Sequence, residues 1–295
     1  MQISYMEYLT LELERGILVD REKVINRRVL VFVMMIIALV YLIGVFVWGL
    51  FMNPQSYEAN YANKFLAPSL NHLFGTDFIG RDMFHRTIKG LSNSIIIGIL
   101  ASIVSSIIAL VAGISSAVFG GWVDKFVNWC VDLCMGLPHL VLLILISFMM
   151  GKGIKGVTAA VALTHWPALT RIVRSEVMQI RSSQYVKAAY KMGRTKSQVA
   201  IQHILPHVIP TYIIGLVLLF PHAIMHEASI TFLGFGMPAE MPAIGVILSE
   251  AMKHISTGKW WLAVFPGLML LIAVLLFDII GENLKKLWDP ESGNE

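Results

Sequence analysis

The sequence predicts an all-α integral membrane protein with about six transmembrane helices. Of its 295 residues, 56% are hydrophobic and only 14% are charged, whereas an ordinary soluble domain has roughly 45–50% apolar and about 25% charged residues. The apolar residues are gathered in blocks about as long as a bilayer is thick, separated by charged loops. This pattern excludes a soluble globular protein and indicates one membrane-embedded unit.

The first span is predicted at Val29–Met52, an uncharged block long enough at about 1.5 Å per residue to cross about 30 Å of hydrocarbon. The next apolar block, Ser92–Gly120, is rich in Gly, Ala and Ser. Because these small residues let helices approach closely in lipid, we expect a central helix there. Further along the chain, spans are predicted at Phe126–Met150, Ile154–Ile172, Val208–Phe235 and Trp261–Gly281.

The segments between the spans alternate between the two sides of the membrane. The charged segment 1–28 is too long and too mixed in charge to begin a signal peptide. With this segment in the cytoplasm, most of the 23 Lys and Arg residues fall in cytoplasmic segments, so the positive-inside rule predicts that both termini are cytoplasmic. The predicted segments are an N-terminal segment 1–28, a first helix 29–52, an external loop 53–91, a transmembrane core 92–281 that includes a cytoplasmic loop 173–207, and a tail 282–295.

Two compositional features carry little functional information. The net charge of +4 is spread over the loops, so it does not indicate a nucleic-acid partner. Cys130 and Cys134 lie four residues apart in one apolar block, so they share a helix face and form no disulfide framework. Their spacing is compatible with a metal, but apolar packing is the favoured role.

The cytoplasmic loop contains a predicted helix at Tyr185–Ala200, interrupted by Gly193 and followed by the sequence HILP at His203–Pro206. A helix, a glycine break and a proline stop predict a compact helical hairpin. Its basic, partly apolar surface is suited to docking into a groove on a soluble partner. Composition alone favours a solvated loop instead.

This loop resembles the "EAA" signature of the permease subunits of ABC importers, which forms their coupling helix. The family's Ala-Ala, Gly and Leu-Pro are in register here, although its leading Glu is replaced by Lys187. His203 stands where the peptide-importing branch often has His. The resemblance implies that the ATPase docks on a coupling element containing Tyr185, Lys187, Ala188, Ala189, Gly193, His203, Leu205 and Pro206.

Two further segments resemble the peptide and nickel branch of that family. The stretch Phe74–Gly90 resembles the Gly-Thr-Asp-x-x-Gly-Arg-Asp block found before the second span in one of its two permease subunits. The stretches His226–Gly236 and Phe265–Pro290 are similar to later motifs of the family, while Ile244 stands where the family usually has Trp. The residues that match the first block are Gly75, Thr76, Asp77, Gly80, Arg81 and Asp82.

The resemblance implies a type I ABC importer permease fold (MetI-like) in the cell membrane. This chain would form half of the path for di- or oligopeptides, or for nickel or metal chelates. The implied partners are a homologous second permease, two ABC ATPase subunits, an extracytoplasmic substrate-binding protein and membrane lipid. The chain itself would be no enzyme and bind no cofactor, since ATP and Mg would be used by the ATPases.

The stretch of this chain most similar to a phosphate-binding loop is Gly151–Thr158. It lacks the Lys before the Thr and is interpreted as a Gly-rich turn.

Polar residues within the spans are candidates to line the path, because such residues are costly in lipid and usually face protein or water. His222 and His226 share a helix face at a spacing that is compatible with a metal. Without a third ligand, hydrogen bonds to neighbouring helices are favoured. A His-Trp pair and a His-x-x-x-His at these places are also similar to the nickel-importing members. The candidate path residues are His165, Trp166, His222, His226 and Glu227.

Two other classes of function remain open at the level of sequence. A secondary transporter driven by an ion gradient usually shows repeated halves and charged midplane residues, and neither is convincing here. A membrane-embedded hydrolase needs a nucleophile and a base, and His165 with Ser175 or Ser147 is an unsupported pairing.

Overall fold

The computed structural model describes residues 29–288, and these residues are almost entirely helical. The predicted N-terminal segment 1–28 and residues 289–295 of the tail lie outside the described residues. Within 29–288 the β structure is limited to one isolated bridge between Thr76 and Asp82. The helices are Val29–Phe51, α2 Met83–Phe119, α3 Gly121–Gly136, α4 His139–Met149, α5 Gly153–Arg181, α6 Gln184–Lys191, α7 Lys196–Val199, α8 Leu205–Phe232, α9 Ile244–Met252 and α10 Trp261–Trp288.

By length and composition, four or five helices qualify as spans, against the predicted count of about six. In the described part of the chain, four helices are long and apolar enough to cross a membrane: Val29–Phe51, α2, the continuous helix Lys196–Phe232 and α10. The bent pair of α3 and α4 makes a fifth if it is counted as one span. The predicted span Ile154–Ile172 lies in α5, which does not qualify. Because α5 packs closely on α2, α4 and α8, protein covers much of it in place of lipid.

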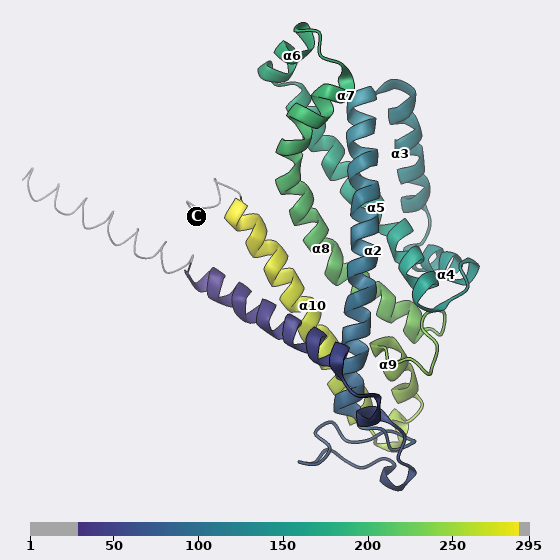
Figure 1. Cartoon of the computed structure of the whole chain (residues 1–295). Helices are drawn as coiled ribbons and strands as arrows, with labels where there is room; N and C mark the ends of the chain where they lie inside the picture. The colour runs from purple at the N-terminus through teal and green to yellow at the C-terminus, as the bar shows by residue number, and fades with distance from the viewer. Residues whose placement is uncertain (1–28, 289–295) are drawn as a thin grey trace, which may run out of the picture.

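Helix α2 is the central element, as the small residues predicted. It begins at Met83 rather than Ser92, so the last part of the predicted external loop 53–91 is helical, and it has 37 residues. Figure 1 shows it running along most of the molecule between α5, α8 and α3. A Cβ added at Gly98 would lie 2.7 Å from Ile224 Cγ1, and one at Gly113 would lie 2.7 Å from Val173 Cγ1. These contacts hold α8 and α5 directly against α2.

The predicted span Phe126–Met150 is broken into two helices. Helices α3 and α4 meet at an angle of 100°, with Leu137 ending α3 and Pro138 preceding α4. A proline favours such a break because it has no N–H to donate and disfavours helical backbone in the residue before it. The bend places His139 at the first position of α4.

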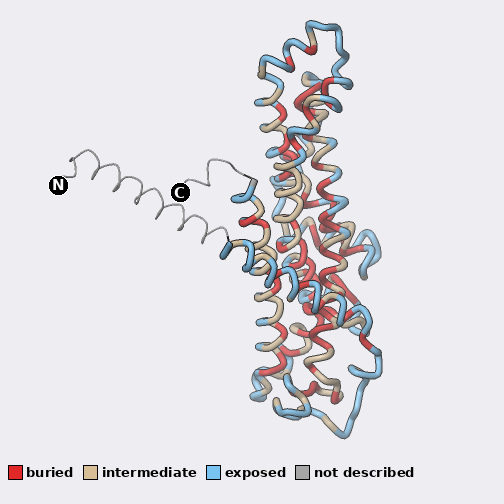
Figure 2. Tube along the Cα trace, turned by 60° about the vertical axis from the view of Figure 1, so that its left-hand side comes forward, coloured by how far each residue is buried: buried red, intermediate tan, exposed pale blue. Residues whose placement is uncertain are grey.

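The first helix lies on the outside of the bundle. Tyr41 Oη donates a hydrogen bond to Met269 Sδ of α10 at 3.2 Å, and Ser92 Oγ of α2 donates to the Phe46 carbonyl at 3.0 Å. Most of its remaining surface is exposed (Figure 2), while the buried residues are concentrated inside the bundle. Such an apolar exposed surface is suited to lipid.

The two ends of the molecule are built differently. Helices α6 and α7 form a cap at one end, and segment 53–82 lies with α9 at the opposite end (Figure 1). Two 3-10 turns, Pro54–Tyr57 and Tyr61–Asn63, shape that segment. Each end carries one of the motifs identified in the sequence, and α2 connects them.

The close contact at Gly113 predicts a specific loss of stability. Gly113→Val should lower the free energy of unfolding by roughly 1–3 kcal/mol, because the added atoms collide with Val173 and overpack the contact. Gly44→Val is the matched control, since an added Cβ there meets no atom within 4 Å. Thermal unfolding in detergent measures both variants, and equal unfolding temperatures would contradict the packing described for α2.

Candidate functional site

The predicted coupling element is a short helical hairpin. Helix α6 ends at Lys191, and Gly193 follows with φ +81°, a backbone conformation that favours glycine. Thr195 then begins α7 with a capping box, in which its Oγ1 accepts from the N–H of Gln198 and its own N–H donates to Gln198 Oε1. The helix predicted at Tyr185–Ala200 with a break at Gly193 is therefore two short helices on either side of that residue, as the predicted hairpin requires.

The proline at the end of the motif does not stop a helix. Pro206 lies in the first turn of α8, where it removes one backbone donor from the helix without ending it. A π-helical turn at Ala200–Ile204 joins α7 to α8, and the helix is continuous over Lys196–Phe232. The hairpin is thus an extension of a membrane-spanning helix.

The hairpin has one apolar face and one basic face. Val186 and Ala189 are buried in a cluster with Val199, Ile204 and Val208, which fixes α6 to the end of the bundle. Among the predicted coupling residues, Tyr185, Lys187, Ala188, Gly193 and Pro206 are exposed, whereas His203 and Leu205 are partly buried. The exposed basic residues of the hairpin are Lys187, Lys191, Arg194 and Lys196.

Cationic side chains from α5 and from the hairpin contact the end of α2. Arg181 Nη1 donates to the Ala117 carbonyl at 2.8 Å, and Lys196 Nζ donates to the Phe119 carbonyl at 3.3 Å. These are the terminal carbonyls of α2, where positive charge is favourable. Nearby, Arg174 of α5 forms a bidentate ion pair with Asp124 of α3 at 2.7 and 2.8 Å. These contacts join the ends of α2, α3 and α5 beside the hairpin.

At the opposite end, the Gly-Thr-Asp-x-x-Gly-Arg-Asp block forms a tight loop. Gly75 and Gly80 have φ of +71° and +82°, and a Cβ at Gly80 would lie 1.8 Å from the Asn60 carbonyl oxygen. Thr76 Oγ1 accepts from the N–H of Leu66 at 2.8 Å. The two glycines and the threonine thus fold segment 53–82 onto itself.

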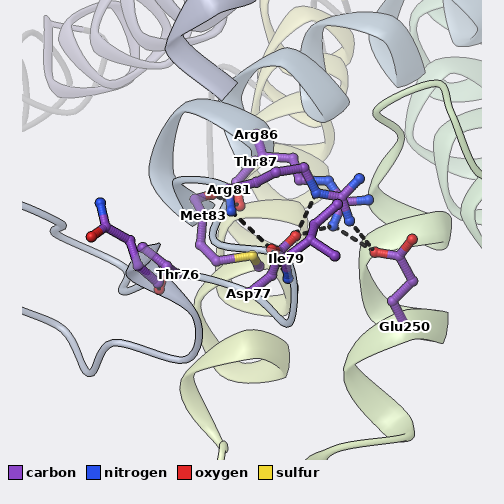
Figure 3. Close-up of polar contacts among 9 residues, drawn as sticks. Thr76, Asp77, Ile79, Arg81, Met83, Arg86, Thr87 and Glu250 are labelled. Atoms are coloured by element: carbon purple, nitrogen blue, oxygen red, sulfur yellow. Dashed lines mark hydrogen bonds and ion pairs between the residues drawn. The ribbon is translucent and has the colours of Figure 1, made fainter. Parts of the chain in front are cut away.

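Asp77 and Glu250 bind two arginines between them (Figure 3). Asp77 Oδ2 accepts from Arg81 Nε at 2.6 Å and from Arg86 Nη1 at 3.1 Å. Glu250 Oε2 accepts from Arg81 Nη2 at 3.0 Å and from Arg86 Nη1 at 2.6 Å. Arg86 is only 2% exposed, so both carboxylates are needed to balance the buried guanidinium pair. We call these four residues the ionic cluster.

Asp82 ends the block and begins α2. Its carboxylate accepts from the N–H of His85 at 3.0 Å, and it contacts the Nδ1 atoms of His72 and His85 at 2.8 and 2.9 Å. Burial raises the pKa of this carboxyl, but these hydrogen bonds outweigh burial and hold the pKa below its usual value. Asp82 therefore caps the helix as a carboxylate.

The sequence motif did not reveal Arg86 and Glu250. Glu250 lies on α9, and 169 residues separate it from Arg81, so local spacing could not connect them. The available signal was Arg86 itself, a charged residue at the start of an apolar helix, which needs a partner. Ile244, the departure from the family pattern, is fully buried in the apolar core and is no part of the outer surface.

Within the spans, three histidines come together, and they are not the predicted pair. The ring centroids of His139, His165 and His226 lie 4.9, 4.5 and 5.0 Å apart, and one nitrogen of each lies within 4.8 Å of the other two. His222 is exposed and lies outside this group. The sequence did not indicate His139, because it lies far from the others along the chain and the Pro138 bend was not foreseen.

The other two candidate path residues, Glu227 and Trp166, form hydrogen bonds within their own helices. Glu227 is fully buried, and its Oε1 accepts from Thr231 Oγ1 at 2.9 Å, so it faces the interior of the bundle. Trp166 is partly buried, and its Nε1 donates to the Leu163 carbonyl at 3.1 Å. Both hydrogen bonds lie within single helices.

The hydrolase pairing is not formed. His165 Nδ1 donates to the Val161 carbonyl at 2.8 Å, and Ser147 Oγ donates to the Phe235 carbonyl at 2.9 Å. Ser175 is exposed, and within residues 29–288 neither serine is hydrogen-bonded to His165. The Gly151–Thr158 stretch is a turn only at Gly151 and Lys152, and the rest of the predicted Gly-rich turn is the start of α5.

The sequence and fold match known transport proteins. Residues 109–290 match the family "Binding-protein-dependent transport system inner membrane component". The chain is 31% identical to the dipeptide transport system permease protein DppC of Bacillus subtilis (strain 168), covering 86% of this chain and 79% of that protein. It is also 31% identical to the oligopeptide transport system permease protein OppC of the same organism, over 88% of this chain and 84% of that one.

The fold agrees with this family. An inward-facing structure of the MetNI methionine ABC transporter superposes with a TM-score of 0.59 at 15% identity, covering 70% of this chain and 98% of the matched chain. That likeness supports the MetI-like arrangement of helices that the motifs implied. The chain therefore belongs to the binding-protein-dependent transport system inner membrane components, and it is the permease subunit of an ABC importer rather than the subunit that hydrolyses ATP.

Proposed function

We propose that this chain forms half of the translocation path of an importer for di- or oligopeptides, with a homologous second permease as the other half. The curated relatives support this cargo, since they are named as dipeptide and oligopeptide permeases. The observation that carries the proposal is the hairpin, whose apolar face is anchored in the bundle and whose basic face is free to dock.

The hairpin is the proposed docking site of an ABC ATPase, with one ATPase for each permease. Its exposed basic residues Lys187, Lys191 and Arg194 would meet acidic groups on the ATPase, and Lys187 adds one of these positive charges where the family has Glu. ATP and Mg would bind on the ATPases, and this chain would hold no cofactor. Docking of a helical element into a groove is a recurring mode of recognition.

This assignment sets the orientation in the membrane. The hairpin and both termini lie in the cytoplasm, in agreement with the positive-inside rule, and the ionic cluster lies on the external side. There, segment 53–82 and α9 would form the surface that receives the substrate-binding protein. Movement of the ATPases would reach α2, α3 and α5 through Arg181, Lys196 and Arg174, so the packed helices move together during alternating access.

The turn at Gly193 provides a test of coupling. Gly193→Val should reduce peptide-stimulated ATP hydrolysis and uptake by a factor of roughly 5–30, because a β-branched residue at φ +81° costs roughly 1–2 kcal/mol. No atom lies within 4 Å of the added Cβ, so the effect comes from the backbone and membrane insertion should be normal. Gly193→Asn is the control and should retain most activity, since Asn tolerates this conformation. If ATP hydrolysis and uptake remained fully coupled in the Val variant, the hairpin would not have this coupling role.

The ionic cluster provides a second test. Glu250→Gln should destabilise the chain by less than the roughly 3–5 kcal/mol expected for breaking a buried ion pair, because Asp77 still contacts both arginines. It should also weaken binding of the substrate-binding protein, as segment 53–82 loses its attachment to α9. Glu240→Gln, at an exposed position, is the control. Thermal unfolding and binding-protein affinity in nanodiscs measure the two effects, and unchanged values for Glu250→Gln would contradict this role.

The cargo is tested with the complete transporter. We expect that the chain, reconstituted with its partner permease, ATPases and binding protein, shows ATP hydrolysis stimulated by di- or oligopeptides. Nickel ions are tested in parallel. If only nickel stimulated ATP hydrolysis, the cargo would be nickel and not peptides. Peptide uptake in the absence of the ATPases would rule out the ABC mechanism.

A further inference from the structure

The three histidines come from three different helices. His139 begins α4, His165 lies in the middle of α5, and His226 lies near the end of α8. Their rings meet at centroid distances of 4.5–5.0 Å. Three imidazoles that converge from separate elements need a physical reason, because each brings two polar nitrogens into an apolar region.

The hydrogen bonds of His165 define its free nitrogen. A carbonyl can only accept, so the Val161 carbonyl, 2.8 Å from Nδ1, places the proton on Nδ1. The neutral ring then has its lone pair on Nε2, which is buried and has no hydrogen-bond partner among the described residues. His139 Nε2 is likewise buried without such a partner. Metal-binding histidines commonly have this arrangement, with one nitrogen bound to a backbone carbonyl and the other free.

We infer that His139, His165 and His226 form a binding site for a divalent transition-metal cation such as Ni²⁺, Co²⁺, Cu²⁺ or Zn²⁺. A tetrahedral ion about 2.1 Å from each nitrogen holds its ligands about 3.4 Å apart, and the three nitrogens already lie within 4.8 Å of one another. Rotation of the side chains closes the difference. Imidazole ligands favour these cations over Mg²⁺ and Ca²⁺, which prefer oxygen.

Ring packing alone explains the cluster less well. His139 and His165 pack edge to face at 82°, a geometry that aromatic rings favour. That contact leaves the two buried Nε2 atoms without hydrogen bonds, and an unsatisfied buried polar atom is destabilising. A cation satisfies both atoms at once, and His226 supplies the third ligand.

The ligand set suits a cation that is bound and released. The group contains no carboxylate, so three neutral ligands leave the charge of the ion uncompensated and at least one coordination position open. Transport requires binding that is strong enough for entry and weak enough for exit. Binding by these residues goes beyond the proposed peptide transport and does not depend on it.

Cobalt binding to the full chain in nanodiscs tests the site, with purification through a tag that contains no histidine. We expect one Co²⁺ per chain by equilibrium dialysis, with absorption bands of a nitrogen-ligated ion and no competition by Mg²⁺. His139→Gln, His165→Gln and His226→Gln should each weaken binding by roughly 10–100-fold. His222→Gln is the matched control on the same helix and should bind as the unaltered chain does.

Two results would overturn the site. The first is that the unaltered chain binds Co²⁺ no more tightly than a variant with all three substitutions does. The other is loss of binding in the His222 and His226 variants with no loss in the His139 and His165 variants, which would assign the metal to the pair predicted from sequence. X-ray absorption on the cobalt-loaded unaltered chain shows directly whether imidazoles are ligands, even if a variant folds poorly. Peptide-stimulated ATP hydrolysis is measured separately, so failure of either proposal is distinguishable.

Discussion

The close packing of α2 on α5 and α8 is the contact on which the rest of the structure depends. In lipid, helices gain little by hiding apolar surface from one another, so association relies on shape and on small residues. Gly98 and Gly113 let Ile224 and Val173 approach the backbone of α2. Larger residues at these two positions would separate the helices that carry the histidines and the hairpin.

Because α2 is one continuous helix, it connects two distant polar structures. At its start, Arg86 joins the ionic cluster and fixes segment 53–82 to α9. At its end, Arg181 of α5 and Lys196 of the hairpin donate to its last carbonyls. Charged groups are thus concentrated at the two ends of the helix, where their solvation or pairing costs least. A continuous helix of this kind is suited to carry the proposed displacement from one end of the molecule to the other.

Whereas α2 is continuous, the chain changes direction sharply between α3 and α4. Pro138 ends the regular helix, and His139 follows it toward α5 and α8. If α3 continued as a straight helix through these residues, His139 would lie in a different place relative to α5 and α8. The histidine cluster therefore depends on a local backbone feature and on the α2 packing that positions α5 and α8.

The sequence by itself determined the membrane class, the central place of α2, the turn at Gly193 and the two family motifs, because each depends on composition or on local spacing. Only the tertiary structure decided that α3 and α4 are bent apart, that α8 continues through Pro206, that Arg86 pairs with Glu250, and that His139 replaces His222 in the histidine cluster. The physical reason is that these outcomes depend on contacts between helices far apart in the chain. Local spacing places His222 and His226 on one helix face, but it contains no information about which neighbouring helix supplies the next ligand.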